Sequence, residues 1–140
     1  MEENMLADAP VMASLPCVDL KGAKNFYGEI LGLQEMEMPG TEEGGQNEAA
    51  IYQCGGGTNL LVYRRETPTT ADHTAAAWIV ADIESVVDAL VAKGVTMETY
   101  DLPDVEYDER GIARSEGVAS AWFKDPEGNI LAVNQVPGMS

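Results

Sequence analysis

Apolar residues recur along the chain at two spacings, and each spacing predicts a different element. Helical spacing begins after Asp19 and again after Asp82, and it ends at Gly32 and Gly94. Short strand-like runs precede and follow these helices, at residues 11–20, 34–38, 48–54 and 59–63 in the first half and 75–83, 96–100, 119–123 and 129–135 in the second. The predicted order of elements is therefore βαβββ, twice.

The two halves match each other at the ends of their helices. An aspartate followed by an aliphatic residue begins each helix, and a glycine followed by an aliphatic residue ends it, which indicates an internal repeat of one supersecondary unit. Two acidic insertions that contain glycine, residues 39–48 and 102–117, interrupt the strands. Neither carries enough apolar surface to be core, so both are predicted to be loops.

Length and repeat together predict a single domain. A chain of 140 residues can form one core but is short for two independent ones. We expect an N-terminal tail at residues 1–10, the domain at 11–136 and a C-terminal tail at 137–140. Within the domain, module one spans 11–64, a polar linker 65–73, and module two 74–136.

Composition narrows the class of partner. Eight basic residues against 24 acidic ones give a net charge of −16, which repels phosphate groups, so neither nucleic acid nor an anionic membrane is an expected partner. No apolar run approaches the roughly 18 residues of a membrane span, and the acidic N-terminus lacks a signal pattern, so a cytoplasmic location is expected. The charge serves either to attract cationic ligands or only for solubility or salt adaptation, and the sequence leaves both open.

The cysteines do not predict a reactive site. Cys17 and Cys54 lie in predicted strands without the spacing of a metal or redox motif, and we expect them to be reduced, small and buried. The chain has one histidine, His73, so a nucleophilic thiol lacks a basic partner.

Two segments resemble a known family. "VDLKGAKNFYGEILGL" (18–33) resembles the first helix of the vicinal-oxygen-chelate superfamily, and "WFKDPEGNILAV" (122–133) resembles its last hairpin. This superfamily includes glyoxalase I, extradiol dioxygenases, and fosfomycin- and bleomycin-resistance proteins. The resemblance covers residues 11–136 and implies an α+β fold, in which two βαβββ modules curl an eight-stranded, partly open sheet around a cavity. Members of this size usually form homodimers, so a homodimer is expected.

Enzymes of this family place metal ligands, typically His, Gln or Glu, on the first and last strands of each module. The matching positions here are Met12, Leu61, Ala75 and Ala132. Their side chains offer one thioether sulfur where a divalent ion requires several nitrogen or oxygen ligands. His73 lies two residues before the expected position and is expected to be exposed or to cap a strand. The resemblance therefore predicts a branch without a bound metal or other cofactor.

Strand alternation assigns the cavity lining once the ligand positions are taken to face inward. The predicted ligand-binding residues, with Pro16 beside them, are Met12, Ser14, Asn59, Leu61, Tyr63, Ala75, Ala77, Ile79, Trp122, Ile130, Ala132 and Asn134. The opposite face is expected to pack under the helices and includes Trp78, Leu131 and Val133. A one-residue register shift would move Trp122 from the cavity into the core. The sequence does not decide between these two positions.

An apolar and aromatic lining with a few amides suits a flat organic ligand. The leading hypothesis is a metal-independent small-molecule-binding protein of the glyoxalase/bleomycin-resistance type that sequesters an aromatic or cationic compound.

The alternative is a glyoxalase-like lyase, isomerase or dioxygenase-related enzyme with a non-standard site. Its acid or base would come from carboxylates that are ordinarily solvated: Glu98, Asp101, Asp104, Glu106, Asp108 and Glu109. A third hypothesis is an accessory protein whose cavity is filled by side chains.

Overall fold

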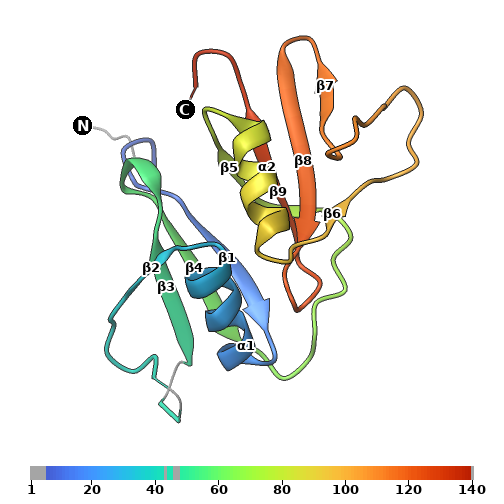
Figure 1. Cartoon of the computed structure of the whole chain (residues 1–140). Coiled ribbons are helices and arrows are strands. Elements are labelled where there is room, and N and C mark those ends of the chain that lie inside the picture. Colours follow the sequence, from blue (N-terminus) through green and yellow to red (C-terminus); the bar gives the residue numbers. More distant parts are fainter. Residues whose placement is uncertain (1–5, 43, 46–47, 140) are drawn as a thin grey trace. The chain divides into compact units, whose positions relative to one another are not determined.

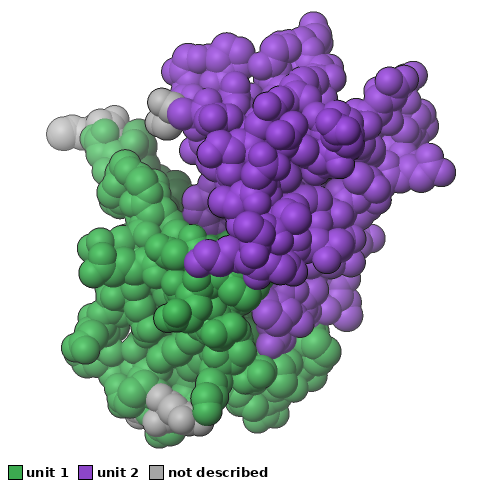
Figure 2. All heavy atoms as spheres, in the orientation of Figure 1, with its two compact units in different colours: residues 1–68 green, residues 69–140 purple. Residues whose placement is uncertain are grey.

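The computed structural model describes residues 6–42, 44–45 and 48–139. The chain divides into two compact units, residues 1–68 and 69–140 (Figure 2), and the boundary falls within the expected linker. Each unit combines a sheet with helical structure, which confirms the predicted α+β class and its two modules. In the described ranges, no helix is long and apolar enough to cross a membrane.

Unit 1 holds a four-stranded sheet in the order β1-β4-β3-β2. Its strands are β1 (Met12–Cys17), β2 (Gln34–Met36), β3 (Ala49–Gln53) and β4 (Asn59–Arg64). β1 runs parallel to β4, and the other pairs are antiparallel. Two helical segments, α1 (Leu20–Lys24) and η1 (Asn25–Ile30), follow β1, and a short turn η2 (Gly55–Gly57) joins β3 to β4 (Figure 1).

The helix of unit 1 begins where the sequence predicts it. The Asp19 carboxylate accepts a hydrogen bond of 3.1 Å from the Gly22 amide, which satisfies a free donor of the first turn. The segment continues as wide π-helical turns in η1, where the Leu31 amide donates to the Phe26 carbonyl at 2.8 Å. Gly32 ends it with φ of 77°, a conformation that a residue with a side chain rarely adopts.

Aromatic side chains fill the space between this helix and the sheet. Phe26 and Tyr27 pack edge to face at 5.2 Å between ring centroids, and Tyr27 lies 6.0 Å from Tyr52 of β3. All three are buried, together with Leu60 and Val62 of β4. The predicted core face of the first module is therefore the face that α1 and η1 cover.

Unit 2 holds a five-stranded sheet with β5-β9-β8-β6 in order and β7 paired to β8. The strands are β5 (Thr74–Ile79), β6 (Met97–Glu98), β7 (Ala113–Ser115), β8 (Val118–Lys124) and β9 (Ile130–Gln135). Helix α2 (Ile83–Ala92) contacts β8 and β9 (Figure 1). It begins at Asp82, whose carboxylate accepts from the Ser85 amide at 3.3 Å, and Gly94 ends it with φ of 93°.

The second insertion is more ordered than the sequence predicts. Residues 102–117 include strand β7, a ninth strand beyond the expected eight, and Ile112 is 1% exposed. The reason is a local turn: the Asp108 carboxylate accepts from the Ile112 amide at 2.9 Å, while Tyr107 pairs with Ala113. In the first insertion, the described residues 39–42, 44–45 and 48 form no strand or helix, as expected, while residues 43, 46 and 47 lie outside the described range.

The turn between β8 and β9 is built on a buried carboxylate. Asp125, which is 5% exposed, accepts hydrogen bonds from the Glu127 amide, the Asn129 amide and the Asn129 side-chain amide at 2.9, 2.9 and 2.8 Å. Gly128 supplies the positive φ of 93° that the turn requires. The predicted hairpin is therefore confirmed, and its aspartate belongs to the core.

The two thiols differ in their surroundings. Cys17 is buried at 2% exposure, as expected, whereas Cys54 is only half-buried. No disulfide bond joins these two residues, both of which lie in the described ranges.

Candidate functional site

The sheet face of unit 1 opposite α1 gathers the residues that the sequence assigns to a ligand. The register pairs Met12 with Asn59, Ser14 with Leu61, and Pro16 with Tyr63. Paired residues point to the same side of a sheet. The five predicted ligand-binding residues of the first module therefore share one face: Met12, Ser14, Asn59, Leu61 and Tyr63.

A pocket of about 660 Å³ lies on this face. Three of the five predicted residues line it, namely Met12, Leu61 and Tyr63, whereas Ser14 and Asn59 lie outside its lining. The structure adds apolar residues that the sequence analysis did not assign: Met38, Pro39, Ala49 and Ile51. Pairing of Ala49 with Tyr63 and Ile51 with Leu61 explains two of them. A prediction that β3 and β4 form an antiparallel hairpin would have assigned Ala49 and Ile51 to this face. No sequence signal assigns Met38 and Pro39 to the pocket.

The rim of this pocket carries two positively and two negatively charged side chains. Arg64, Arg65, Glu48 and Glu66 also line it. The Arg64 guanidinium donates to the Val18 carbonyl at 3.1 Å and lies 4.0 Å from the Glu48 carboxylate, which holds its side chain in place. An apolar floor with polar groups around the mouth is the usual design of a site for a small organic molecule.

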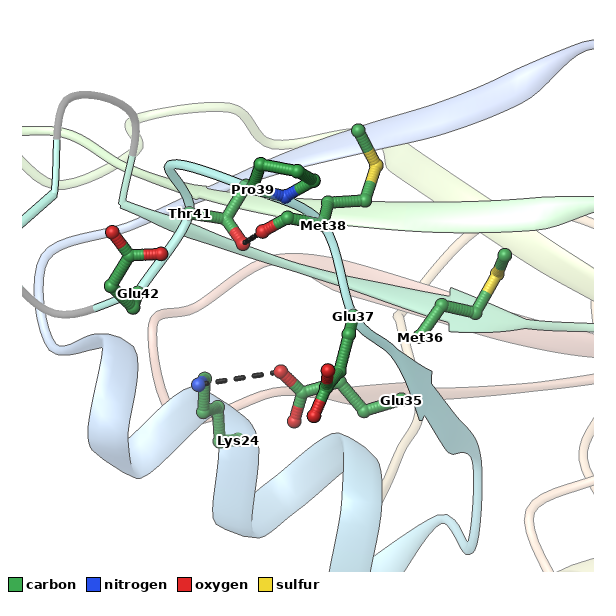
Figure 3. Close-up of a pocket in the computed structure, with 8 residues that line it drawn as sticks. All are labelled: Lys24, Glu35, Met36, Glu37, Met38, Pro39, Thr41 and Glu42. Atoms are coloured by element: carbon green, nitrogen blue, oxygen red, sulfur yellow. Dashed lines mark hydrogen bonds and ion pairs between the residues drawn. The ribbon is translucent and has the colours of Figure 1, made fainter.

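A second hollow of unit 1, of about 570 Å³, lies on the helix side of β2 and is different in character. Figure 3 shows Glu35 and Glu37 reaching toward Lys24, while Met36 and Met38 extend away from it. Lys24 and Glu35 form an ion pair at 3.3 Å. Strand alternation separates these groups, so the helix side is ionic and the thioether side faces the apolar surface of the sheet.

Unit 2 brings most of its predicted residues to one face as well. Neighbouring strands pair Ala77 and Trp122 with Ala132, and pair Ile79 with Asn134. Ile130 pairs with Lys124 on the same face. Trp78, Leu131 and Val133 lie on the other face, as predicted. Leu131 and Val133 are buried there, whereas Trp78 is only half-buried.

Alternation leaves two residues of this face to be placed by the structure, Ala75 and Trp122. The register of β5 shifts between Thr74 and Ala76, so alternation does not assign Ala75 to this face, and Thr74 is the partner of Ile130. The two positions left open for Trp122 are also resolved: its neighbour Phe123, which is 1% exposed, is the core residue. The Trp122 indole N–H donates to the Thr74 hydroxyl at 3.2 Å.

Two tyrosines that the sequence analysis did not assign surround Trp122. The ring centroids of Tyr100 and Tyr107 lie 6.4 and 6.3 Å from the Trp122 ring, and both are nearly perpendicular to it. The Tyr107 hydroxyl accepts from the Tyr100 amide at 3.1 Å. Burial raises the pKa of the Tyr100 hydroxyl, and the Glu98 charge adds to this shift. Tyr107 lies in the insertion that was expected to be a loop, and no periodic pattern marks it.

Ion pairs fasten residues 102–117 to α2. Arg110 donates to both carboxylate oxygens of Asp88, at 2.9 and 3.2 Å. Arg114 contacts Glu84 at 2.8 Å and Asp108 at 2.6 Å. Asp108 is therefore engaged in holding the segment. Four other acids in or next to this insertion are exposed, as expected for solvated carboxylates: Asp101, Asp104, Glu106 and Glu109.

These ion pairs predict a contribution to acid stability. The Arg110 hydrogen bonds lower the pKa of Asp88, and the Ile112 amide and Arg114 lower that of Asp108. A carboxylate with a lowered pKa stabilises the fold above its unfolded pKa of about 4, and that contribution is lost as pH falls through the folded value. Arg110→Gln should therefore weaken the dependence of the urea midpoint on pH below about 5. An unchanged pH profile would contradict the role of the pair.

The family-equivalent metal positions do not fit a metal. Met12, Leu61 and Ala132 face the sheet surfaces of their own units, and none of them carries a nitrogen or oxygen side-chain ligand. Among residues 6–42, 44–45 and 48–139, no group of three or more His, Cys, Asp or Glu is placed to hold an ion. His73 is exposed, and its Nδ1 lies 3.2 Å from the Thr74 carbonyl oxygen.

Comparison with known proteins places this geometry in a family. The family model described as "Glyoxalase/Bleomycin resistance protein/Dioxygenase superfamily" matches residues 9–133. No curated protein sequence gave a match.

Solved structures agree on the fold. A protein from Bacillus anthracis assigned to the glyoxalase family has a TM-score of 0.73 at 18% identity, over 97% of this chain and 99% of its own. A glyoxalase/bleomycin resistance protein from Streptomyces has a TM-score of 0.62 at 24% identity, over 91% and 100%. Lactoylglutathione lyase from Agrobacterium tumefaciens has a TM-score of 0.61 at 19% identity, over 91% and 93%. The chain belongs to the glyoxalase/bleomycin resistance protein/dioxygenase superfamily.

Proposed function

We propose that this protein is a metal-independent small-molecule-binding member of the superfamily, which holds a flat organic compound against the sheet of unit 1. The observation that carries the proposal is the pocket of about 660 Å³ whose floor combines Leu61 and Tyr63 with Met12. A pocket of this size lies within the usual range for small-molecule sites. An aromatic ligand would contact the Tyr63 ring, which is half-buried and faces the pocket.

Metal independence is proposed on donor chemistry. A divalent ion in this family requires several nitrogen or oxygen ligands, and the four equivalent positions hold Met, Leu and Ala. Protein purified without chelators is expected to contain far less than one zinc, nickel, iron or manganese per chain by elemental analysis. A near-unit content that disappears in His73→Ala would contradict the proposal and favour the enzyme alternative.

Replacing Tyr63 tests the pocket directly. Tyr63→Ala is expected to weaken binding of the neutral flat probe quinoline about fivefold, because the aromatic contact and its buried area are lost. Tyr63→Phe keeps the ring and should bind as the wild type does. Isothermal titration calorimetry gives the affinities, and thermal melting confirms that both variants fold. Equal affinity of the wild type and Tyr63→Ala would move the ligand site elsewhere.

We also propose a cytoplasmic homodimer. β1 and β2 are the edge strands of the unit 1 sheet, and open edges of a sheet invite pairing with a second chain. Cys17 and Cys54 form no disulfide bond in the described part of the chain, which is in keeping with a reducing compartment. Light scattering at micromolar concentration should give twice the chain mass, and a monomer mass would reject the dimer.

A further inference from the structure

The face of unit 2 that carries Trp122 combines a carboxylate with several aromatic rings. β6 and β8 pair so that Glu98 stands directly opposite Trp122. Side chains at such paired positions start about 5 Å apart on the same side of the sheet. The Tyr100 and Tyr107 rings lie against Trp122, with centroids 6.4 and 6.3 Å away. Two tyrosine rings and one carboxylate therefore gather around the Trp122 indole.

We infer that this cluster, Glu98, Tyr100, Tyr107 and Trp122, binds the charged nitrogen of an organic cation. The face of an aromatic ring is negative and attracts cations, most strongly for tryptophan. Glu98 adds a full negative charge and forms no salt bridge within the described part of the chain. Residues 69–140 hold 4 basic and 13 acidic side chains, a formal charge of −9, so the surrounding field favours the same ligands.

The cluster is held in place before any ligand arrives. The Trp122 indole N–H donates to the Thr74 hydroxyl at 3.2 Å, and the Tyr107 hydroxyl accepts from the Tyr100 amide at 3.1 Å. Ion pairs between Arg110 and Asp88 fasten the segment that carries Tyr107. Fixed side chains lose little entropy on binding, so the attraction is retained as affinity.

This inference uses no residue of the unit 1 pocket, so it can be tested separately from the proposed function.

A matched pair of probes isolates the effect of charge. N-methylquinolinium is a permanent cation, while quinoline has nearly the same flat ring and is neutral at a pH above its own pKa. We expect calorimetry to show about tenfold tighter binding of the cation to the wild-type protein at low salt. In a Trp78→Phe background, the indole N–H resonance of Trp122 should shift as N-methylquinolinium is added.

Glu98→Gln supplies the decisive comparison. It should weaken the binding of N-methylquinolinium about fivefold and leave quinoline unchanged, because only the charge is removed. Glu116→Gln is the matched control, since it removes the same charge at the turn between β7 and β8 and should have little effect. Trp122→Leu should weaken the binding of N-methylquinolinium more than Glu98→Gln does.

Three results would overturn the inference. These are equal affinities of the two probes when binding is followed by the Trp122 resonance, equal losses in Glu98→Gln and Glu116→Gln, and an unshifted Trp122 resonance at saturation. Tyr63→Ala changes only the unit 1 pocket. If this variant binds quinoline as tightly as the wild type does, the proposed function fails, and the inference about the Trp122 cluster is unaffected.

Discussion

Replacing Asp125 with alanine is expected to lower the free energy of unfolding by about 3 kcal/mol, because it leaves buried donors without an acceptor. Its carboxylate accepts from the Glu127 and Asn129 amides and from the Asn129 side chain, all within 2.9 Å. Asn129 is 2% exposed, so water cannot readily replace the lost partner. Urea denaturation followed by circular dichroism measures the change.

Two control variants sharpen this prediction. Asp125→Asn keeps one acceptor oxygen but places an NH2 group opposite one of the three N–H donors. It should therefore lower the free energy of unfolding by about 1 kcal/mol. Lys124→Ala changes an exposed neighbour in the same hairpin and should stay within about 0.5 kcal/mol. If Asp125→Ala proves no worse than Lys124→Ala, the turn does not depend on the carboxylate.

Tyr52→Phe is expected to raise the free energy of unfolding by about 2 kcal/mol. Tyr52 is 1% exposed, and its hydroxyl has no hydrogen-bond partner within the described ranges, so the wild type buries a polar group without compensation. Phenylalanine keeps the ring against Tyr27 and removes that group. A loss of stability in Tyr52→Phe would show that the hydroxyl is satisfied in solution.

The same variant should change the behaviour of the protein at alkaline pH. Burial raises the pKa of Tyr52 to about 12, and the charges of Glu35 and Cys17 add to the shift. Between a pH of about 10 and 12 the unfolded chain releases a proton that the folded chain keeps, so wild-type stability falls as pH rises. Tyr52→Phe removes this contribution, whereas Tyr63→Phe retains it, and urea midpoints near neutral pH and near pH 11 compare the three proteins.

Local signals predicted the elements of the fold well. Asp19 and Asp82 begin the helices because a carboxylate satisfies the free amides of a first turn, and the glycines at 32 and 94 end them with positive φ. Alternation also placed Leu61 and Tyr63 on the same sheet face as Met12, since pairing register follows from the pattern of apolar residues.

What the sequence did not predict depends on tertiary contacts. Ile112 is buried because Asp108 closes a turn around it, and an acidic segment gives no periodic sign of such a turn. A register shift in β5 interrupts alternation at Ala75, so alternation does not assign its face, and no glycine or proline marks the position. Tyr107 reaches Trp122 through the same folded insertion. Whether any of these residues binds a ligand stays a prediction.

The thioethers of the unit 1 pocket expose it to oxidation. Met12 and Met38 line the pocket and are 42% and 45% exposed, so peroxide reaches both sulfurs without unfolding the chain. Conversion to the sulfoxide replaces a flexible apolar side chain by a polar one, and reductases can reverse it. Leu61 and Ile51 would remain apolar, while the lining at Met12 and Met38 became hydrophilic. Oxidative conditions would thereby shift the pocket toward more polar compounds and leave the core of the sheet unchanged.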